Sequence, residues 1–401
     1  MPVLAGVAVC VAGLFLAITA VRMALAVAVL RRPAPGAEAS EIGASGGAAP
    51  GFGASGGAAP GSGAVTVVQA ILAGDPTMPA NLRENLANHP EAHFVWLIDY
   101  SDAEGRRVAD DLAGSTAAAV DVVLTPPAPP GANPKVFKLV RGAPLAGDLI
   151  AVLDDDTVLP PGALDRAVAA LSQGDLVTGI PVYRTGGGVW SRLVAAFVNS
   201  NSMLTYLPVL VFSQPVTING MFVLTRHDVL DEVGGFAAIV DRLCDDYELA
   251  KLYRRAGKRI VQTTIVHPLS TTVSGPAEYA RLLRRWLVFA NQLLRESMTL
   301  PAFCLVVVPS VLPLVAVVLA AAGGDPVALA AVVGALFVKA VAVAALRRLT
   351  SATASEGPAT VVAEVVSDLL LPLHALTTAV RPRRVRWRGK DIRFGTGGSL
   401  T

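Results

Sequence analysis

Three consecutive aspartates, Asp154 to Asp156, are the residues of this sequence best suited to chemistry. They directly follow LIAVL, an apolar run with the composition of a buried strand. Adjacent carboxylates repel one another unless a cation lies among them, and hard divalent cations take oxygen ligands and bridge to substrate phosphates. Asp154 and Asp156 are therefore predicted to hold a divalent metal ion, Mn²⁺ or Mg²⁺. The alternative is a solvated acidic turn in which Asp155 or Asp156 caps the next helix.

Two further acidic positions could act beside this site. Asp99 follows the apolar run VWLI and, with Asp102, could accept hydrogen bonds from a nucleotide base or ribose; the alternative is a loop or helix-cap carboxylate. Asp246 lies in the acidic start of a predicted helix, where a carboxylate could remove a proton from an attacking hydroxyl. Its alternative role is stabilisation of the helix N-terminus.

Basic and aromatic residues occur together at Arg284, Arg285 and Trp286. The planar, always charged guanidinium of arginine suits a diphosphate. The alternative is a basic and aromatic belt at a membrane interface.

The elements that must position these residues alternate between strands and helices. Apolar runs with strand character occupy residues 65–72, 93–102, 120–125 and 147–156. This alternation predicts an α/β domain whose mostly parallel sheet is covered on both faces. Ligands of such sheets bind at the carboxyl ends of the strands, where Asp99 and Asp154 both fall.

Membrane segments are predicted at both ends of the chain. Residues 1–32 are long, apolar and closed by Arg31 and Arg32, which favours an anchor over a cleaved signal peptide. Residues 33–64, rich in Gly, Ala, Ser and Pro, are predicted to be a flexible linker. The domain follows at 65–297, and two transmembrane helices follow at 298–348.

The last segment, 349–401, is predicted to hold an interfacial or re-entrant helix and a basic tail. The helix, at 361–380, carries Glu364, Asp368 and His374, which are costly against lipid. Basic residues beside the apolar runs mark the cytoplasmic side, so we expect a multi-pass protein of the cell (inner) membrane with a cytoplasmic domain.

Composition and the absence of certain motifs argue against several other classes of protein. A net charge of +2 gives no indication of a nucleic-acid partner. Three cysteines without a CxxC spacing predict neither a disulfide framework nor a zinc site. No GxSxG, HExxH, P-loop or GxGxxG motif follows a predicted strand, which argues against serine hydrolases, zinc proteases and dinucleotide oxidoreductases.

Five motifs, in order, carry a resemblance to a known family. They are GANPKVFKL (131–139), LDDDTVLPPG (153–162), INGMFVLTRHDVLDEVGGF (218–236), CDDYELAKLYRRAGKRI (244–260) and RLLRRW (281–286). Together they resemble the ceramide glucosyltransferase family, which includes bacterial relatives acting on hopanoid lipids. The resemblance implies a glycosyltransferase A-type, Rossmann-like domain. It also implies inverting, metal-dependent transfer of a hexose from a UDP-sugar to the hydroxyl of a membrane lipid, ceramide-like or hopanoid-like.

The resemblance also assigns roles to matching positions. Asp99 is expected near the nucleotide, Asp154 and Asp156 at the metal and diphosphate, and Asp246 as the catalytic base. The remaining residues assigned to nucleotide-sugar binding are Lys135 of the NPK stretch, and Arg285 and Trp286 at the end of the (Q/R)xxRW motif.

Two positions depart from the family pattern. Leu282 stands where the family has Gln or Arg, four residues before Trp286. Arg281 shares a helix face with Arg285, and our hypothesis is that Arg281 substitutes from the adjacent register. In the first strand, Gln69 and Ala70 stand where relatives often carry Lys, which leaves the identity of the sugar open.

Two other functions remain alternatives. A processive polysaccharide synthase shares the Asp sites and the Trp motif but needs more membrane spans to form a channel. A non-catalytic membrane scaffold would bind no UDP-hexose and show no turnover.

Overall fold

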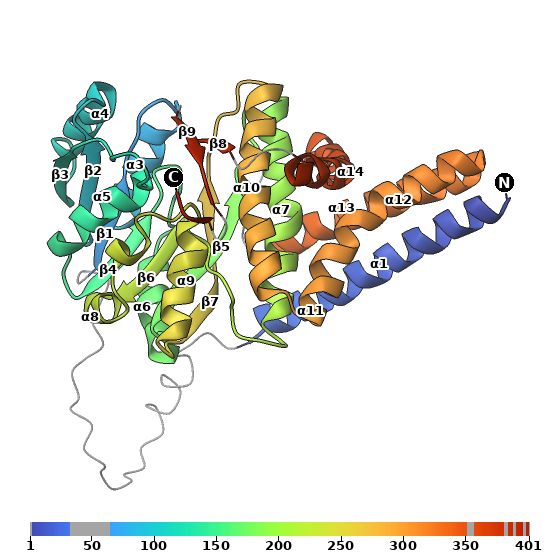
Figure 1. Cartoon of the computed structure of the whole chain (residues 1–401), viewed down its shortest axis with the longest axis horizontal. Helices are drawn as coiled ribbons and strands as arrows, with labels where there is room; N and C mark the ends of the chain where they lie inside the picture. Colours follow the sequence, from blue (N-terminus) through green and yellow to red (C-terminus); the bar gives the residue numbers. More distant parts are fainter. Residues whose placement is uncertain are drawn as a thin grey trace, which may run out of the picture.

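A computed structural model describes residues 2–32, 65–350, 357–380, 384–387, 390–395 and 398–400. The predicted linker at 33–64 lies outside these residues. Seven strands form one sheet in the order β3-β2-β1-β4-β6-β5-β7 (Figure 1). Their bounds are β1 Val65–Ala70, β2 His93–Asp99, β3 Ala119–Thr125, β4 Leu149–Leu153, β5 Leu176–Tyr183, β6 Phe222–Arg226 and β7 Ile260–Leu269.

The sheet confirms the predicted fold class. The four strands expected from apolar runs are β1 to β4, and all of them pair in parallel. β5 and β7 are also parallel to each other, whereas β6 runs antiparallel to both of its neighbours. Every residue of β1 and β4 is buried, as expected for central strands covered on both faces.

Helices cover both faces of the sheet, and alternate residues of each strand enter different cores. The first core joins Val67 and Trp96 to Leu82 and Leu164, and the second joins Val68 and Leu97 to helices on the other face. The helices of the first face are α3 Met78–Asn88, α4 Ala103–Ala113 and α6 Ala163–Ala170; those of the second are α5 Pro134–Gly142, α8 His227–Glu232 and α9 Asp245–Arg255. Short 3₁₀ turns lie at η2 Ala143–Leu145, η3 Leu171–Gln173 and η4 Phe236–Ile239.

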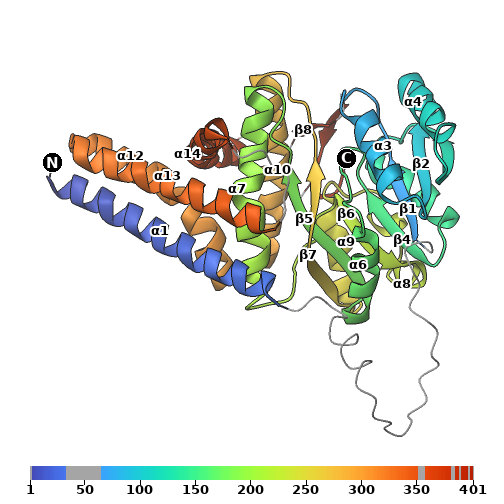
Figure 2. The ribbon, with the colours of Figure 1, turned by 180° about the vertical axis from the view of Figure 1, so that it is seen from behind.

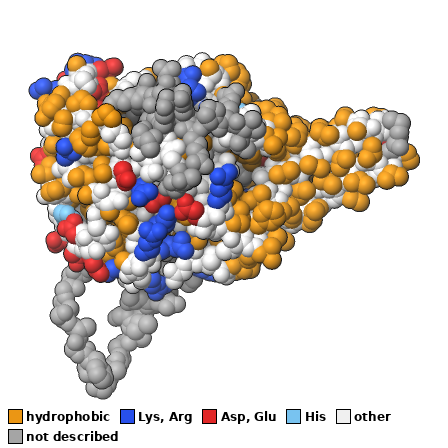
Figure 3. Space-filling model, viewed as in Figure 1, with side chains coloured by type: hydrophobic (Ala, Val, Ile, Leu, Met, Phe, Trp, Pro, Cys, Tyr) orange, Lys and Arg blue, Asp and Glu red, His pale blue; other side chains and the backbone are white. Residues whose placement is uncertain are grey.

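Four helices among the described residues are long and apolar enough to cross a membrane, so this is a membrane protein. They occupy Pro2–Leu30, Leu300–Gly323, Pro326–Leu349 and Pro358–Thr378. The first is α1 Pro2–Leu30; the second comprises α11 Leu300–Ala302, η5 Phe303–Val307 and α12 Val308–Gly323; the last two are α13 Pro326–Leu349 and α14 Pro358–Val380. Hydrophobic side chains cover the arm that projects from the α/β part (Figure 3).

Figure 1 and Figure 2 show that α14 takes a different direction from the other membrane helices. α1 and α12 run side by side across both views, whereas α14 is seen almost end-on. Two long helices, α7 Val189–Val209 and α10 Pro276–Ser297, lie between the sheet and this bundle. α14 therefore crosses the bundle at a steep angle rather than joining it in parallel.

The C-terminal residues return to the α/β part. β8 Arg384–Trp387 pairs with β9 Lys390–Arg393 in a separate hairpin. Beyond it, the amide of Leu243 donates to the carbonyl of Gly398, and the amide of Leu400 donates to the carbonyl of Asp241. These contacts hold the chain that leads into α9.

Two buried ion pairs join α13 to α14. The Lys339 Nζ lies 2.8 Å from a carboxylate oxygen of Asp368, and both side chains are less than a tenth exposed. Arg347 pairs with Glu364 and also donates to the carbonyl of Asn199 in α7. The two cations are about 12 Å apart along α13 and the two acids about 6 Å apart along α14, as crossing helices require. Glu364 and Asp368, two ionisable residues of the 361–380 segment, thus face protein rather than lipid.

Removing one partner of such a pair leaves an uncompensated buried charge. Lys339→Met is expected to lower the free energy of unfolding by about 3 kcal/mol, read as a lower melting temperature in detergent. The double variant Lys339→Met/Asp368→Leu removes both charges and is expected to recover most of that loss. Equal melting temperatures for the wild type and the single variant would show that the pair contributes nothing.

Candidate active site

The acidic turn after β4 gives its three carboxylates different roles. The Asp155 carboxylate is buried and accepts a hydrogen bond from the backbone amide of Leu72 at 2.8 Å, which fastens the end of β1. Asp154 lies on the other side of the turn and forms an ion pair with Lys135 at 2.7 Å. The middle aspartate is therefore structural, and Asp154 and Asp156 remain available for chemistry.

Asp156 has surroundings that disfavour its charged form. Burial, together with repulsion from Asp154 and Asp155, raises the pKa of Asp156 to about 7. The hydroxyls of Thr157 and Thr271 donate to it, each at 3.1 Å, and only partly offset this effect. A cation between Asp154 and Asp156 would relieve the repulsion.

Lys135 links this turn to the second acidic cluster. Asn133 caps α5 by accepting hydrogen bonds from the amides of Lys135 and Val136, which sets the first helical turn. The Lys135 ammonium lies 2.7 Å from Asp154 and 3.2 Å from Asp245, and it donates to the carbonyl of Gly220 at 2.8 Å. Burial alone would lower the pKa of Lys135, but attraction to the two carboxylates raises it well above its usual value.

Asp246 lies beside this lysine at the first turn of α9. Burial, with repulsion from Asp245, raises the pKa of Asp246 to about 6. A small pocket here is lined by Lys135, Gly220, Asp245 and Asp246 among other residues. A Cβ at Gly220 would lie 2.9 Å from the Asp246 Cβ, so only glycine allows this close approach. A carboxylate with this pKa can accept a proton near neutral pH.

The two aspartates at the end of β2 also have different roles. Asp102 caps α4 through the amide of Gly105 and accepts from the amide of Ala73, the helix-cap role described above as its alternative. Asp99 lies 3.4 Å from the buried ammonium of Lys138, which also donates to the carbonyl of Ile71.

Sequence reasoning missed Lys138. Lys138 lies three residues after Lys135, on the same side of α5, and this spacing could have indicated it.

The RLLRRW stretch lies on α10, and its residues face different surroundings. The Trp286 ring stacks on Phe197 and meets the Tyr183 ring edge-on, with centroids 6.0 Å apart in each pair. Burial and, after it, the charge of Asp156 raise the pKa of the Tyr183 hydroxyl. Arg285 lies close enough to Tyr183 to offset part of this rise. Leu282 packs with Trp286 in the same apolar cluster, whereas Arg281 is exposed.

The structure therefore brings most of the predicted site together. Asp154, Asp245 and Asp246 lie around Lys135, and Arg285 lies with Tyr183 near Asp156. Asp99 is held by Lys138 at the end of the neighbouring strand. Arg281 is exposed and lies close enough to Glu278 to help lower the pKa of that carboxyl.

The residues at this site fit a divalent ion whose coordination is completed by the substrate. In the described ranges, no three His, Cys, Asp or Glu side chains form a ready metal cage. Asp154 and Asp156 supply two carboxylates that repel each other. Mg²⁺ is commonly held by one or two carboxylates together with substrate phosphates and water.

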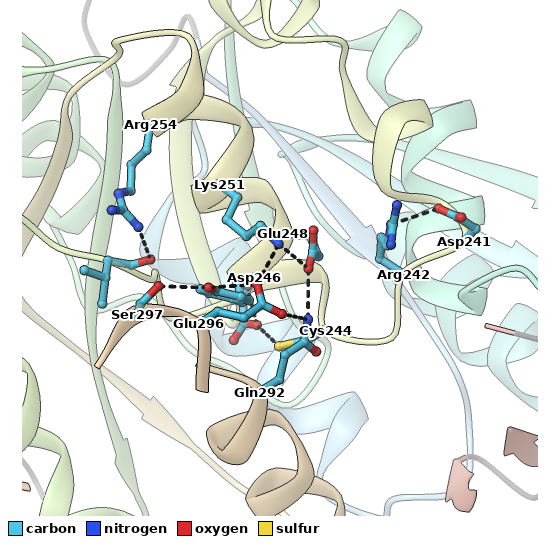
Figure 4. Close-up of polar contacts among 12 residues, drawn as sticks. Asp241, Arg242, Cys244, Asp246, Glu248, Lys251, Arg254, Gln292, Glu296 and Ser297 are labelled. Carbon is cyan, nitrogen blue, oxygen red and sulfur yellow. Dashed lines mark hydrogen bonds and ion pairs between the residues drawn. The ribbon is translucent and has the colours of Figure 1, made fainter. Parts of the chain in front are cut away.

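A second polar network fixes α9 against the end of α10 (Figure 4). Lys251 bridges Glu248 and Glu296 at 3.1 and 2.9 Å, and Gln292 donates to Glu248 at 3.0 Å. The Tyr247 hydroxyl donates to Glu296 at 3.2 Å. Because α10 leads directly into the membrane segment at Leu300, this network ties the turn that carries Asp246 to the membrane bundle.

Comparison with protein families shows which family the chain belongs to. The family described as glycosyl transferase family 21 matches residues 58–400, which contain every site residue described above. The chain belongs to glycosyl transferase family 21. It is an enzyme that transfers a sugar, and the resemblance to ceramide glucosyltransferases is confirmed.

Several solved structures are similar to this family 21 glycosyltransferase. A mannosyltransferase from Pyrobaculum calidifontis, in complex with GDP-Man and Mn²⁺, is 17% identical, with 93% of this chain and 99% of that chain covered and a TM-score of 0.47. A glucosyl-3-phosphoglycerate synthase from Mycobacterium tuberculosis, with Mn²⁺, UDP and phosphoglyceric acid, is 18% identical, with 59% and 79% covered and a TM-score of 0.36. S. aureus TarS 1-349, with UDP-GlcNAc, is 13% identical, with 84% and 98% covered and a TM-score of 0.35.

Proposed function

We propose that this family 21 glycosyltransferase moves a hexose from a UDP-sugar to the hydroxyl of a membrane lipid, ceramide-like or hopanoid-like, with inversion at the anomeric carbon. The observation that carries the proposal is Asp246, a partly buried carboxylate of raised pKa beside the Lys135–Asp154 pair. Asp246 can take a proton while the residues beside it bind a diphosphate.

The reaction is a single displacement. The acceptor oxygen forms a bond to the anomeric carbon as the bond from that carbon to the diphosphate oxygen breaks, and UDP leaves. Asp246 takes the proton of the acceptor hydroxyl. The carboxylate is placed on the acceptor side because α9 is fastened to α10, the helix that enters the membrane.

The other site residues bind the donor in this proposal. Asp154 and Asp156 would hold Mn²⁺ or Mg²⁺, which offsets the charge of the departing diphosphate. Lys135 and Arg285 face the same phosphates, because an ammonium and a guanidinium both bind phosphate oxygens. Trp286 packs behind them, and Asp99 accepts hydrogen bonds from the nucleoside.

We infer the following membrane arrangement. α1, the Leu300–Gly323 helix and α13 cross the bilayer, with the α/β domain on the cytoplasmic side of the cell (inner) membrane. α14 lies along the interface, because it crosses the bundle steeply and turns its charged residues toward α13 (Figure 2). The acceptor reaches the site from the bilayer along α7 and α10.

The function is tested by analysis of products. The full-length protein in phosphatidylcholine vesicles is supplied with UDP-hexoses and with ceramide or a hydroxylated hopanoid, and the lipid extract is examined by mass spectrometry. We expect a lipid bearing one hexose, with the anomeric configuration opposite to that of the donor. A polymer would support the processive synthase instead, and the absence of both UDP-hexose binding and product would support the scaffold.

Arg281 gives a test within this proposal. If it replaces the motif residue missing at Leu282, Arg281→Ala raises the KM for the donor about 10-fold, since it removes one charged contact to phosphate. Arg295→Ala, an arginine near the other end of α10, is the matched control. The substitution hypothesis is wrong if turnover and donor affinity of Arg281→Ala equal those of the wild type, and Arg281 is then an ordinary surface arginine.

A further inference from the structure

Cys244 makes a direct contact with the carboxylate assigned as the base. It is the N-cap residue of α9, it is buried, and its thiol donates to the Asp246 Oδ1 at 2.9 Å. The backbone amide of Tyr247 donates to the same oxygen at 2.7 Å (Figure 4 shows the thiol contact). One carboxylate oxygen therefore receives two donors from its own helix turn.

The other oxygen of Asp246 is open. Among the described residues, none forms a hydrogen bond to Oδ2. A Cβ built at Gly220 would lie 3.5 Å from Oδ2, so the missing side chain of Gly220 leaves space next to this oxygen. That space belongs to the small pocket that Lys135 and Asp245 also line.

We propose that Cys244 is a positioning residue, whose thiol holds Oδ1 of Asp246 and so directs Oδ2 to receive the proton of the acceptor. This inference rests on the proposed function, in which Asp246 is the base. A carboxylate with both donors on Oδ1 cannot rotate about its Cβ–Cγ bond without losing them, so Oδ2 keeps one direction.

The thiol also adjusts the proton affinity of the base. Burial and repulsion from Asp245 raise the pKa of Asp246, while hydrogen bonds from Cys244 and Tyr247 stabilise the charged form and limit that rise. The charged and titratable groups that face Asp246 are Asp245 of the same turn, Lys135 of α5 and Tyr206 of α7. Loss of the thiol donor raises the pKa further, so the ionised base appears only at higher pH.

The test is the pH profile of kcat/KM for the full-length protein in vesicles, with UDP-glucose and ceramide or with the pair that product analysis identifies. Cys244→Ala is expected to move the acidic limb upward by about half to one pH unit, which lowers the rate about three- to tenfold at pH 5.5 and leaves it close to wild type at pH 8.5. Cys244→Ser keeps a donor and restores the wild-type limb. Cys304→Ala, at an exposed cysteine far along the chain, is the matched control and is expected to leave the acidic limb unshifted.

The outcomes separate this inference from the proposed function. An unshifted limb together with an unchanged rate in Cys244→Ala overturns the positioning role while Asp246 remains the base. Failure of Cys244→Ser to restore the limb overturns it too. If Asp246→Asn keeps wild-type turnover, Asp246 is not the base and the inference falls with that assignment. If the wild-type protein forms no glycosylated lipid, the proposed function itself is wrong.

Discussion

Asp246→Asn should lower kcat by at least about 100-fold, because a positioned general base contributes about 100- to 10,000-fold to such reactions. Asparagine keeps the shape of the side chain and can still accept from the Cys244 thiol and the Tyr247 amide at one oxygen. It cannot take a proton from a hydroxyl. The affinity for the UDP-sugar should change little, because Asp246 faces the acceptor in this proposal.

The measurement is single-turnover and steady-state transfer to lipid, together with calorimetric binding of the UDP-sugar. Asp241→Asn is the matched control, because Asp241 lies five residues earlier, is half-exposed and pairs with Arg242. A fall in donor affinity that equals the fall in kcat/KM would place Asp246 on the donor instead. Wild-type turnover in Asp246→Asn would remove it from the mechanism.

Asp156→Asn should separate stability from function. Burial and repulsion from Asp154 and Asp155 act against the charge at Asp156, so its removal should raise the melting temperature in the absence of divalent metal. The same change removes a carboxylate from the proposed metal pair. Affinity for the UDP-sugar in the presence of Mn²⁺ should therefore fall at least about 10-fold.

Asp155→Asn is the control for the loss of a charge at this turn. Its amide oxygen can still accept from the Leu72 amide, so β1 stays fastened and Mn²⁺-dependent binding of the donor should persist. Asp156 is excluded as a metal ligand if Mn²⁺ and the UDP-sugar bind the Asp156→Asn variant as they bind the wild type. A lower melting temperature without metal would show that Asp156 stabilises the fold through Thr157 and Thr271.

The sequence alone determined the features that depend on local pattern. Apolar runs predicted β1 to β4. For β1, β2 and β4 the reason is that a central strand must be apolar on both faces, whereas β3 is the edge strand of the sheet. The start of α5 also depends on local residue types, since Asn133 caps the helix and Pro134 fits its first turn. The membrane helices followed from length and hydropathy, and the family followed from the order of its motifs.

Only the tertiary structure decided which of several similar residues does what. Asp154, Asp155 and Asp156 are alike in sequence. In the structure, Asp155 accepts a hydrogen bond from the chain at the end of β1, whereas Asp154 pairs with Lys135 at the start of α5. The pairing of Lys339 with Asp368 likewise depends on how two helices cross. These choices are set by contacts between residues far apart in the chain, and no local pattern encodes them.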